Sequence, residues 1–369
     1  MGDLPKKRCY KNAKVTSNTN KEKVFDTDKY LTYDVLSIVF KYLNGMDLLN
    51  ASMVCRSWME VANDEKRTRG GDTFLTRYGI ASTGIHYKTR IVHKLKSKPA
   101  LGLVFKSCHS VCKEDCHCTL FPKDCAVITL GTYGVVFNNK EMEEASDNVV
   151  CAFLPKIPGT TIEVISCKKN FTGQYYSQLF AAFEGCENDR PKCLLFFCNL
   201  EGRDSTKSIT KMLLERCDHA VKPSVWGGVV HDLYICNSKN FKSENCPQLA
   251  YSIAVILSGS VDSWSVVINK KYCSKQLVEM RLKAFKDLVS LRKHSMGFMF
   301  ACCERGQNMF AECNVESSIF KKYFPKIPLV GCFGDGEFGY TIEPNKTSNV
   351  KNAHCYKERS TVFLIITYG

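Results

Sequence analysis

Cysteine and histidine residues form the densest group of side chains in this 369-residue chain that could bind a metal. The group consists of Cys108, His109, Cys112, Cys116, His117, Cys118 and Cys125. Structural zinc sites use such ligands, but they favour two pairs of cysteines with two to four residues inside each pair. Here the successive cysteines are separated by three, three, one and six residues, so two such pairs do not emerge. We therefore predict a loop without a metal and keep zinc as the alternative.

A second candidate is the adjacent thiol pair Cys302 and Cys303, which follows an apolar run typical of a strand. If strand geometry continues, one thiol points inward and the other outward. The outward thiol could be modified, because Arg305 nearby would favour its thiolate. A thiol enzyme would also need a base such as His231 or His294, and nothing in the sequence brings these residues together. We predict a binding or structural role and no catalysis.

A glycine motif, Gly334 to Gly339, fits the G-x-G-x-x-G pattern of dinucleotide-binding proteins. Such a fingerprint must open a helix, whereas the residues that follow here continue as a strand. We therefore predict no cofactor and interpret Asp335-Gly336 as a hairpin turn.

Two glycine turns, one at Gly306 and one at Gly336, predict an exposed surface that faces a substrate or ligand, because loops at strand ends often carry function. Its residues are Cys302, Cys303, Arg305, Gly306, Gly336 and Glu337. Charge reversal at Arg305 and Glu337 is then expected to leave thermal stability unchanged. The alternative is that both turns are only tight connections.

The N-terminal part of the chain predicts a small helical docking module. Leu31, Val35, Val39 and Leu43 recur every four residues, as one face of a helix requires. Asn44-Gly45 ends this helix, and Asp47 is the expected cap of a second one. About forty residues cannot bury so much apolar surface alone, so a partner or the rest of the chain must cover it.

Beyond residue 70 the pattern changes to short β-rich runs separated by turn residues, with two helices among them. The first helix begins after Ser274 and is expected to bury Leu277, Met280, Ala284, Phe285, Leu288 and Leu291. The second helix begins near Asn314 and ends at Pro325. Several runs are joined by turns too short for a crossover helix, so we expect an α/β fold with mixed or antiparallel sheets. A boundary is expected near residue 260.

The 21 cysteines, many in apolar runs, and an N-terminus without an apolar signal segment indicate a reducing compartment, cytoplasmic and nuclear. No apolar stretch is long enough to cross a membrane, so no membrane partner is expected. The formal net charge is +14, but no nucleic-acid-binding motif accompanies it, so we expect no nucleic-acid partner. Residues 1–27 are polar and basic and predict a flexible tail.

The order of residues in this N-terminal module resembles an F-box. The resemblance rests on Leu31, Asp34, Val35-Leu36, Val39-Phe40, Tyr42-Leu43, Asp47-Leu48-Leu49, Val54-Cys55-Arg56 and Trp58. Thr32 stands where the family usually has proline and could cap the helix through its hydroxyl. The resemblance implies that these residues, apart from Tyr42, Asp47 and Arg56, bind the Skp adaptor and, through it, the cullin and RING subunits of a ubiquitin ligase.

Residues 296–339, together with Gly227-Gly228 and Leu120-Phe-Pro-Lys, resemble the FIST domain. The implied organisation is a tail at 1–27, an F-box at 28–69, and the N-terminal and C-terminal parts of a FIST body at 70–260 and 261–369. The resemblance implies that the body binds protein substrates, with chromatin and transcription regulators as a candidate class. The alternative is that the body senses a small molecule and thereby controls partner binding.

Overall fold

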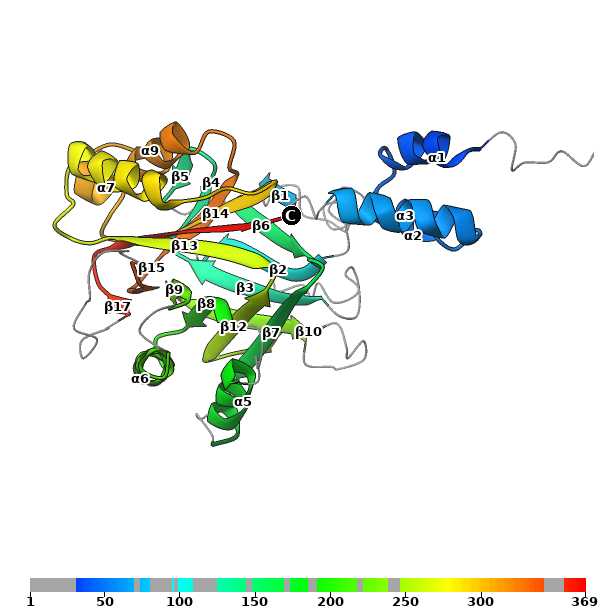
Figure 1. Cartoon of the computed structure of the whole chain (residues 1–369). Coiled ribbons are helices and arrows are strands. Elements are labelled where there is room, and N and C mark those ends of the chain that lie inside the picture. The colour runs from blue at the N-terminus through cyan, green and yellow to red at the C-terminus, as the bar shows by residue number, and fades with distance from the viewer. Residues whose placement is uncertain are drawn as a thin grey trace, which may run out of the picture.

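Three N-terminal helices project from one side of an α/β body in the computed structural model (Figure 1). They are α1 (Tyr33–Phe40), α2 (Gly45–Ala51) and α3 (Arg56–Arg69). The structure describes residues 31–69, 74–79, 95, 99–108, 125–143, 148–168, 173–184, 191–217, 222–237, 246–341 and 355–369. The predicted tail at residues 1–27 lies outside these ranges.

The body is built from three six-stranded sheets. In spatial order, sheet A contains β1 (Phe74–Gly79), β6 (Asn148–Pro155), β2 (Pro99–Ser107), β3 (Ala126–Thr132), β10 (Asp232–Asn237) and β11 (Gln248–Leu249). Sheet B contains β13 (Val261–Ile268), β18 (Thr361–Tyr368), β14 (His294–Cys302), β15 (Leu329–Gly334), β4 (Gly134–Phe137) and β5 (Lys140–Met142). Sheet C contains β17 (Tyr356–Lys357), β16 (Glu337–Gly339), β9 (Ser224–Val229), β8 (Pro191–Cys198), β12 (Ser252–Gly259) and β7 (Thr160–Cys167).

Each sheet is mixed, with one parallel pair of strands among antiparallel ones. Apolar side chains from all three sheets meet in one central core around Trp226. The indole Nε1 of Trp226 donates a hydrogen bond to the carbonyl of Val362, at 3.1 Å. Buried aromatic rings of Phe197, Phe298 and Phe300 pack around the indole. The predicted fold, a small helical module followed by an α/β body with mixed sheets, is therefore confirmed.

The remaining helices cover the outer faces of two sheets. Figure 1 shows α7 (Lys275–Leu288) and α9 (Val315–Tyr323) on one side of the body, and α5 (Gly173–Glu184) and α6 (Arg203–Glu215) on the opposite side. The single-turn helix α8 (Gln307–Phe310) precedes α9. Both predicted helices form, and Ser274 caps α7 through a hydrogen bond from the amide of Leu277.

The predicted buried face of α7 is wrong except at Phe285. The helix buries Val278, Leu282 and Phe285, whereas Leu277 and Met280 are 36% and 57% exposed. Two apolar rows run along this helix, and helical spacing alone does not say which row meets the sheet.

The predicted hairpin turn at Asp335-Gly336 is also wrong. The strand before it, β15, pairs with β14 and β4 in sheet B, whereas β16 after it pairs with β9 and β17 in sheet C. Gly336 adopts a φ of 100°, which side chains rarely tolerate, where the chain crosses between the two sheets.

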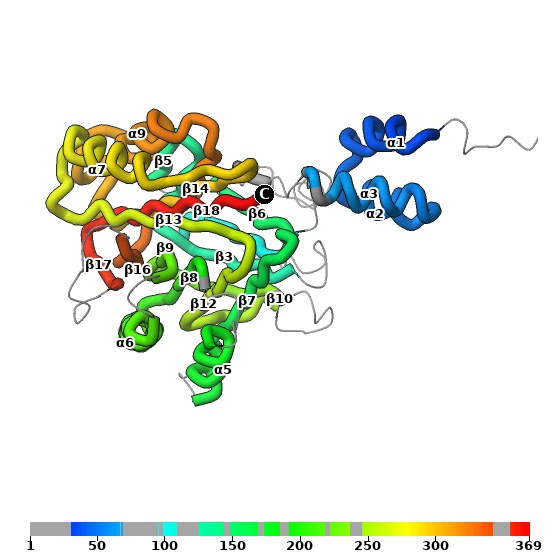
Figure 2. Tube along the Cα trace, viewed as in Figure 1, coloured from blue at the N-terminus to red at the C-terminus, as the bar shows by residue number. Residues whose placement is uncertain are grey.

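The boundary expected near residue 260 falls at the turn between β12 and β13. Strands from the two sides of this boundary interleave, since β4 pairs in sheet B and β16 pairs in sheet C. Figure 2 shows the last strand, β18, running beside β13 and β14 through the middle of the body. The two segments therefore share their sheets. In the part of the chain that the structure describes, no helix has the length and hydropathy needed to cross a membrane.

Candidate functional site

The three-helix module begins with two short helices whose ends are set by local hydrogen bonds. Asn44 caps α2, because its side-chain oxygen accepts hydrogen bonds from the amides of Met46 and Asp47, both at 2.9 Å. The predicted cap, Asp47, instead lies in the first helical turn, where its carboxylate accepts a hydrogen bond from Asn44. Thr32 precedes α1, and its hydroxyl makes no capping hydrogen bond. Both cap predictions are corrected accordingly.

The module has a small core of its own. It is formed by Leu36, Phe40, Leu48, Ala51, Val61 and Ala62, with Leu43 and Trp58 packed against it. The ring of Phe40 meets the edge of Trp58 with 5.4 Å between ring centroids. This core holds α1 and α2 on α3 and leaves the opposite sides of the two short helices uncovered.

The uncovered sides carry an unusual concentration of apolar side chains, which we call the docking face. Eleven of the eighteen large apolar side chains that are exposed among the described residues lie between Leu31 and Met59. They are Leu31, Tyr33, Val35, Ile38, Val39, Tyr42, Met46, Leu49, Met53, Val54 and Met59. Exposed apolar patches of this kind usually mark protein interfaces.

Helical spacing places most of these side chains in two stripes. Val35, Ile38, Val39 and Tyr42 lie along one side of α1 and its C-terminal turn, and Met46, Leu49 and Met53 lie along α2. The buried side chains of the core fall between these positions and face the opposite direction. Each short helix therefore carries apolar residues on its exposed side as well as on its buried side.

The sequence prediction combined both sets of residues. Of its twelve candidate residues, Leu31, Asp34, Val35, Val39, Leu49, Val54 and Cys55 are exposed. Leu36, Phe40 and Leu48 are at most 2% exposed and form the core of the module, and half-buried Leu43 and Trp58 pack against this core. The predicted contact role of Leu36, Phe40 and Leu48 is corrected to a core role.

Six exposed side chains were not among the predicted contact residues: Tyr33, Ile38, Tyr42, Met46, Met53 and Met59. For Ile38 and Tyr42, the signal that could have found them is the second apolar row, which starts at Val35 and continues at helical spacing.

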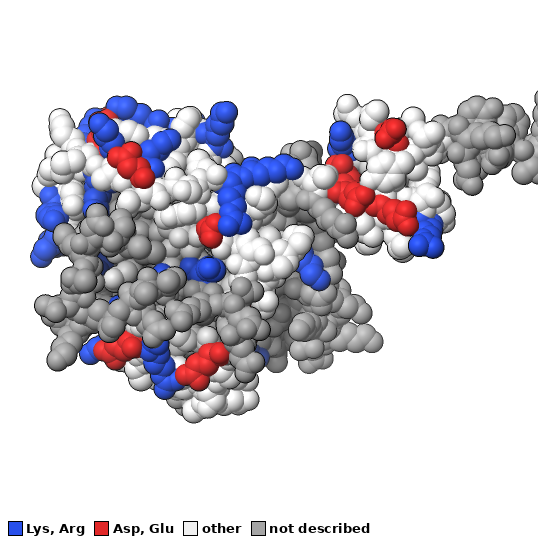
Figure 3. All heavy atoms as spheres, viewed as in Figure 1, with Lys and Arg blue, Asp and Glu red and all other residues white. Residues whose placement is uncertain are grey.

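Charged side chains also lie on the three-helix module. Figure 3 shows acidic and basic side chains on this module, and both kinds over α7 and α9 of the body. The phenol of Tyr33 donates a hydrogen bond of 2.5 Å to Asp64 on α3. That hydrogen bond is the main cause of the raised pKa of Tyr33.

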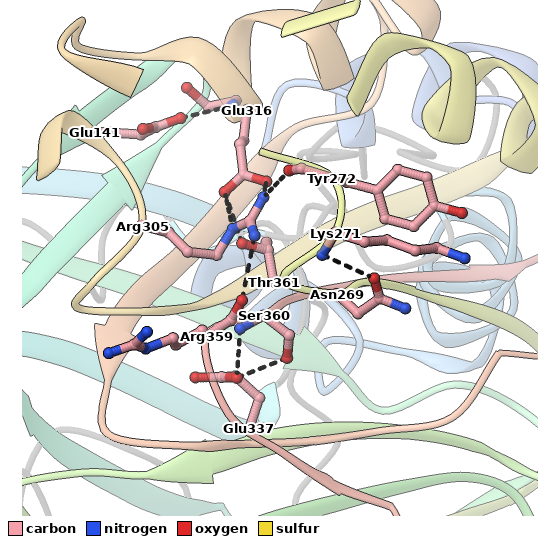
Figure 4. Close-up of polar contacts among 11 residues, drawn as sticks. Glu141, Asn269, Lys271, Tyr272, Arg305, Glu316, Glu337, Arg359, Ser360 and Thr361 are labelled. Atoms are coloured by element: carbon pink, nitrogen blue, oxygen red, sulfur yellow. Dashed lines mark hydrogen bonds and ion pairs between the residues drawn. The ribbon is translucent and has the colours of Figure 1, made fainter. Parts of the chain in front are cut away.

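The second predicted surface, around Cys302 and Arg305, is buried. The guanidinium of Arg305 is fully buried and binds both carboxylate oxygens of Glu316, at 2.7 and 3.1 Å. It also donates to the backbone carbonyls of Tyr272 and Arg359 (Figure 4). The hydroxyl of Thr361 donates to Glu316 at 2.6 Å. Arg305 therefore joins the turn after β14 to α9 and to the start of β18.

Glu337 is buried in the same region. One of its carboxylate oxygens accepts hydrogen bonds from the amide and the hydroxyl of Ser360, at 3.0 and 2.6 Å (Figure 4). Burial raises the pKa of Glu337 well above its usual range. Gly306 and Gly336 are buried too, and an added Cβ at Gly306 would lie 2.3 Å from the carboxylate of Glu143. The expectation of an exposed surface is therefore wrong for Arg305, Gly306, Gly336 and Glu337.

The two neighbouring thiols differ, as strand alternation predicts. Cys302 is 5% exposed, and Cys303 is half-buried. A hydrogen bond between them raises the pKa of Cys302 and lowers that of Cys303. The cause of the lower pKa is thus the neighbouring thiol and not Arg305, whose guanidinium is held by Glu316.

Glu141 on β5 is a third buried carboxylate of this region. One of its oxygens accepts a hydrogen bond of 2.6 Å from the amide of Ser317 at the start of α9. The other oxygen is buried without a hydrogen-bond partner among the described residues. Burial, together with the nearby negative charge of Glu316, raises the pKa of Glu141 to about 7.

The replacement Glu141→Gln is expected to stabilise the protein at pH 8 and to change little at pH 5. The pKa of this carboxyl rises from 4.5 to about 7 on folding. The stability that it contributes is therefore fully present below pH 4.5 and is lost as the pH rises through about 7. Above that range the folded protein carries an unfavourable buried charge worth about 3 kcal/mol, which glutamine lacks. Urea unfolding of both proteins at the two pH values measures this difference. The exposed Glu163→Gln is the matched control, and an equal effect of Glu141→Gln at both pH values would contradict the assignment.

The predicted cysteine and histidine cluster lies largely outside the described residues, which include only Cys108 and Cys125 of its members. Among the residues that are described, no group of three or more histidine, cysteine or acidic side chains is arranged to hold a metal ion. The alternative of a zinc site in this cluster is therefore not tested.

Comparison with known proteins identifies the class of the N-terminal module. The F-box domain model matches residues 30–70, which contain α1, α2, α3 and the docking face. The chain thus carries an F-box domain, as the resemblance of its N-terminal residues implies.

Similarity to individual proteins extends beyond this domain. The chain is 24% identical to F-box only protein 22 of Homo sapiens over 385 aligned positions, which cover 91% of this chain and 93% of that protein. The corresponding protein of Pongo abelii is similar to the same extent. An F-box/LRR-repeat protein of Arabidopsis thaliana is 36% identical over 78 residues, which cover 20% of this chain and 14% of that protein.

Proposed function

We propose that this protein is a substrate-recognition subunit of a Skp, cullin and F-box ubiquitin ligase. The docking face of the F-box binds the Skp adaptor, and through it the cullin and RING subunits. The body, which we assign to the FIST family, holds protein substrates for ubiquitination and proteasomal degradation. The observation that carries the proposal is the uncovered apolar surface of α1 and α2, which the core of the module cannot bury.

The chemistry required of such a subunit is positioning. The chain makes and breaks no bonds in this proposal, since the ubiquitin-charged enzyme supplies the reactive thioester. Binding the ligase and the substrate on one chain raises the effective concentration of substrate lysines near that thioester. We place this activity in the cytoplasm and nucleus, with chromatin and transcription regulators as a candidate class of substrate.

Proximity labelling in cells with the proteasome blocked tests the proposal. The intact protein is compared with a variant that lacks residues 30–65. We expect the intact protein to label the Skp adaptor, the cullin and the RING subunit, and the shortened protein to lose all three labels. Substrates should be labelled by both proteins and carry ubiquitin only with the intact one. Equal labelling of the adaptor by the two proteins would refute the ligase role.

A further inference from the structure

One long strand edge of the body has no neighbouring strand among the described residues. Strand β7 forms the end of sheet C and pairs with β12 over all eight of its residues, from Thr160 to Cys167, without a register shift. Within the described ranges no strand pairs with its other side. Such an edge presents unpaired backbone N–H and C=O groups, which another extended chain can bind.

Most other terminal strands are shorter than β7 or bonded to another segment, and β1, the terminal strand of sheet A, contains six residues. The terminal strands β5, β11 and β17 contain only two or three residues each. The edge of β13 is bonded to another segment, because the amide of Val267 donates a hydrogen bond of 2.9 Å to the hydroxyl of Thr341. By contrast, β7 is long and contains no proline, lysine or bulge, the usual means of blocking an edge.

A groove runs along this edge of β7. It is lined by residues Glu163–Ser166 of β7 and by Gln178, Ala181 and Ala182 of α5, and its volume is about 600 Å³. Leu179 and Phe183 of α5 are buried against sheet C and fix the helix beside the strand. Because the helix turns two alanines toward the groove, space remains between helix and strand for an added backbone. Figure 1 shows α5 lying next to β7 at the end of sheet C.

The side chains of β7 are only partly covered on both faces of the sheet. Ile162 and Val164 are half-buried against the central core, and Ile165 is half-buried against the core beneath α5. An added strand would cover these β-branched side chains with its own alternate residues, which is the usual source of specificity in strand addition.

The charge in the groove is negative. Glu163 is exposed and makes no ion pair with another described residue, although the chain as a whole has a formal net charge of +14. A lysine or arginine of an added strand would lie opposite this carboxylate.

We propose that the groove between β7 and α5 binds an extended segment of a partner protein by β-strand addition. The segment alternates β-branched residues with a lysine or arginine that meets Glu163. This inference rests on the proposed function in one respect, namely that the partner is a substrate of the ligase. The groove itself is independent of the F-box, which lies in a different part of the chain.

Binding of labelled peptides to the full-length protein tests the proposal. The probes are pools of fluorescein-labelled eight-residue peptides in which Val, Ile or Thr alternates with Lys. Their binding is measured by fluorescence anisotropy. We expect a basic pool to bind and the same pool with Glu in place of Lys to bind at least about 10-fold more weakly. Methylation of alternate backbone nitrogens should abolish binding, because it removes the N–H donors that pair with β7. Hydrogen exchange of the amides in residues 160–167 should slow when the peptide is bound.

Two variants and one control locate the binding site. Ala181→Trp fills the groove and should weaken peptide binding at least about 10-fold, whereas Ala284→Trp, at an exposed position of α7 outside the groove, should not. Glu163→Lys should reverse the preference between basic and acidic peptides, and its exposed side chain keeps the test valid if the tryptophan variant fails to fold.

Several outcomes would overturn the proposal. The first is that no pool binds the wild-type protein, and the second is that Ala181→Trp leaves binding unchanged. Dimers that dissociate in Ala181→Trp would assign the edge to a second copy of this chain. Peptide binding that occurs only after removal of residues 1–27 would assign it to the chain's own tail. Adaptor binding is measured on the same preparations, so loss of the adaptor with retained peptide binding would refute the ligase role and leave the groove standing.

Discussion

Replacing Val35 and Val39 together with aspartate is expected to lower the affinity for the Skp adaptor by at least about 100-fold while the F-box remains folded. Both side chains lie on the docking face and are 41% and 45% exposed, so a carboxylate at either position is solvated in the free protein. In the complex the same carboxylates would lose water without gaining a partner, which costs several kcal/mol, and a 100-fold loss corresponds to about 2.7 kcal/mol. Calorimetric titration of the purified adaptor into the full-length protein measures the change.

A matched control separates this loss from a general effect of added charge. Met280→Asp places the same group on an exposed apolar position of α7, where the native side chain is 57% exposed. Adaptor binding should be the same in this variant as in the wild-type protein. If Met280→Asp weakened binding as much as the double variant, the docking face would not be the adaptor site.

Aspartate at Leu36 and Leu48 should also abolish adaptor binding, but for a different reason. Both side chains are in the core of the F-box, at 2% and 0% exposure, so the carboxylates would unfold the three helices before any partner arrives. Limited proteolysis distinguishes the two cases, because only the core variant should be cut within residues 31–69. The sequence pattern treated the two kinds of position alike, and only the structure assigns them to opposite sides of the helices.

The F-box shows what helical spacing can and cannot predict. Leu36 and Phe40 recur at an interval of four residues, and so do Val35 and Val39 one position earlier. Both rows satisfy the period of a helix, so the pattern predicts the helix but not its buried face. In α7 the same ambiguity led to the wrong face. The choice depends on which row meets α3 or sheet B, and those contacts come from residues far away in the sequence.

The strands of the body were more predictable than their partners. Runs such as those of β3, β8, β12 and β18 are continuous apolar segments, because both faces of the sheets are covered and the strands have no polar side. Their assignment to sheets could not be predicted. An Asp-Gly turn is typical of a hairpin, but Asp335-Gly336 connects two strands that belong to different sheets.

Arg305 illustrates the same limit for polar residues. A charged residue next to glycine after a strand is typical of an exposed turn, and the partner that buries it, Glu316, lies on another element. A sequence alone gives no sign that the two meet. The prediction that charge reversal at Arg305 and Glu337 leaves stability unchanged depended on exposure, and both side chains are 0% exposed.

Arg305→Met is therefore expected to destabilise the body by about 3 to 5 kcal/mol, the usual cost of removing one partner of a buried ion pair. Methionine has a similar length and fills much of the same space, so the main loss is electrostatic. The replacement leaves the carboxylate of Glu316 with the hydroxyl of Thr361 as its remaining side-chain donor among the described residues. The backbone carbonyls of Tyr272 and Arg359 lose the hydrogen bonds that the guanidinium donates to them. Urea unfolding followed by tryptophan fluorescence in a Trp58→Phe background reports the body, because Trp226 and Trp264 both lie there.

The double variant Arg305→Met with Glu316→Gln decides whether the loss comes from the unpaired charge. If Arg305→Met destabilises mainly by leaving a buried carboxylate without its cation, removing that charge should recover a large part of the lost stability. If the loss comes instead from packing and from the two backbone carbonyls, the double variant should be no more stable than the single one. A single variant as stable as the wild-type protein would contradict the buried pair altogether. Because the pair joins the turn after β14 to α9 and β18, its loss should also loosen these elements together. Hydrogen exchange of the α9 amides should therefore be faster in the single variant than in the double variant.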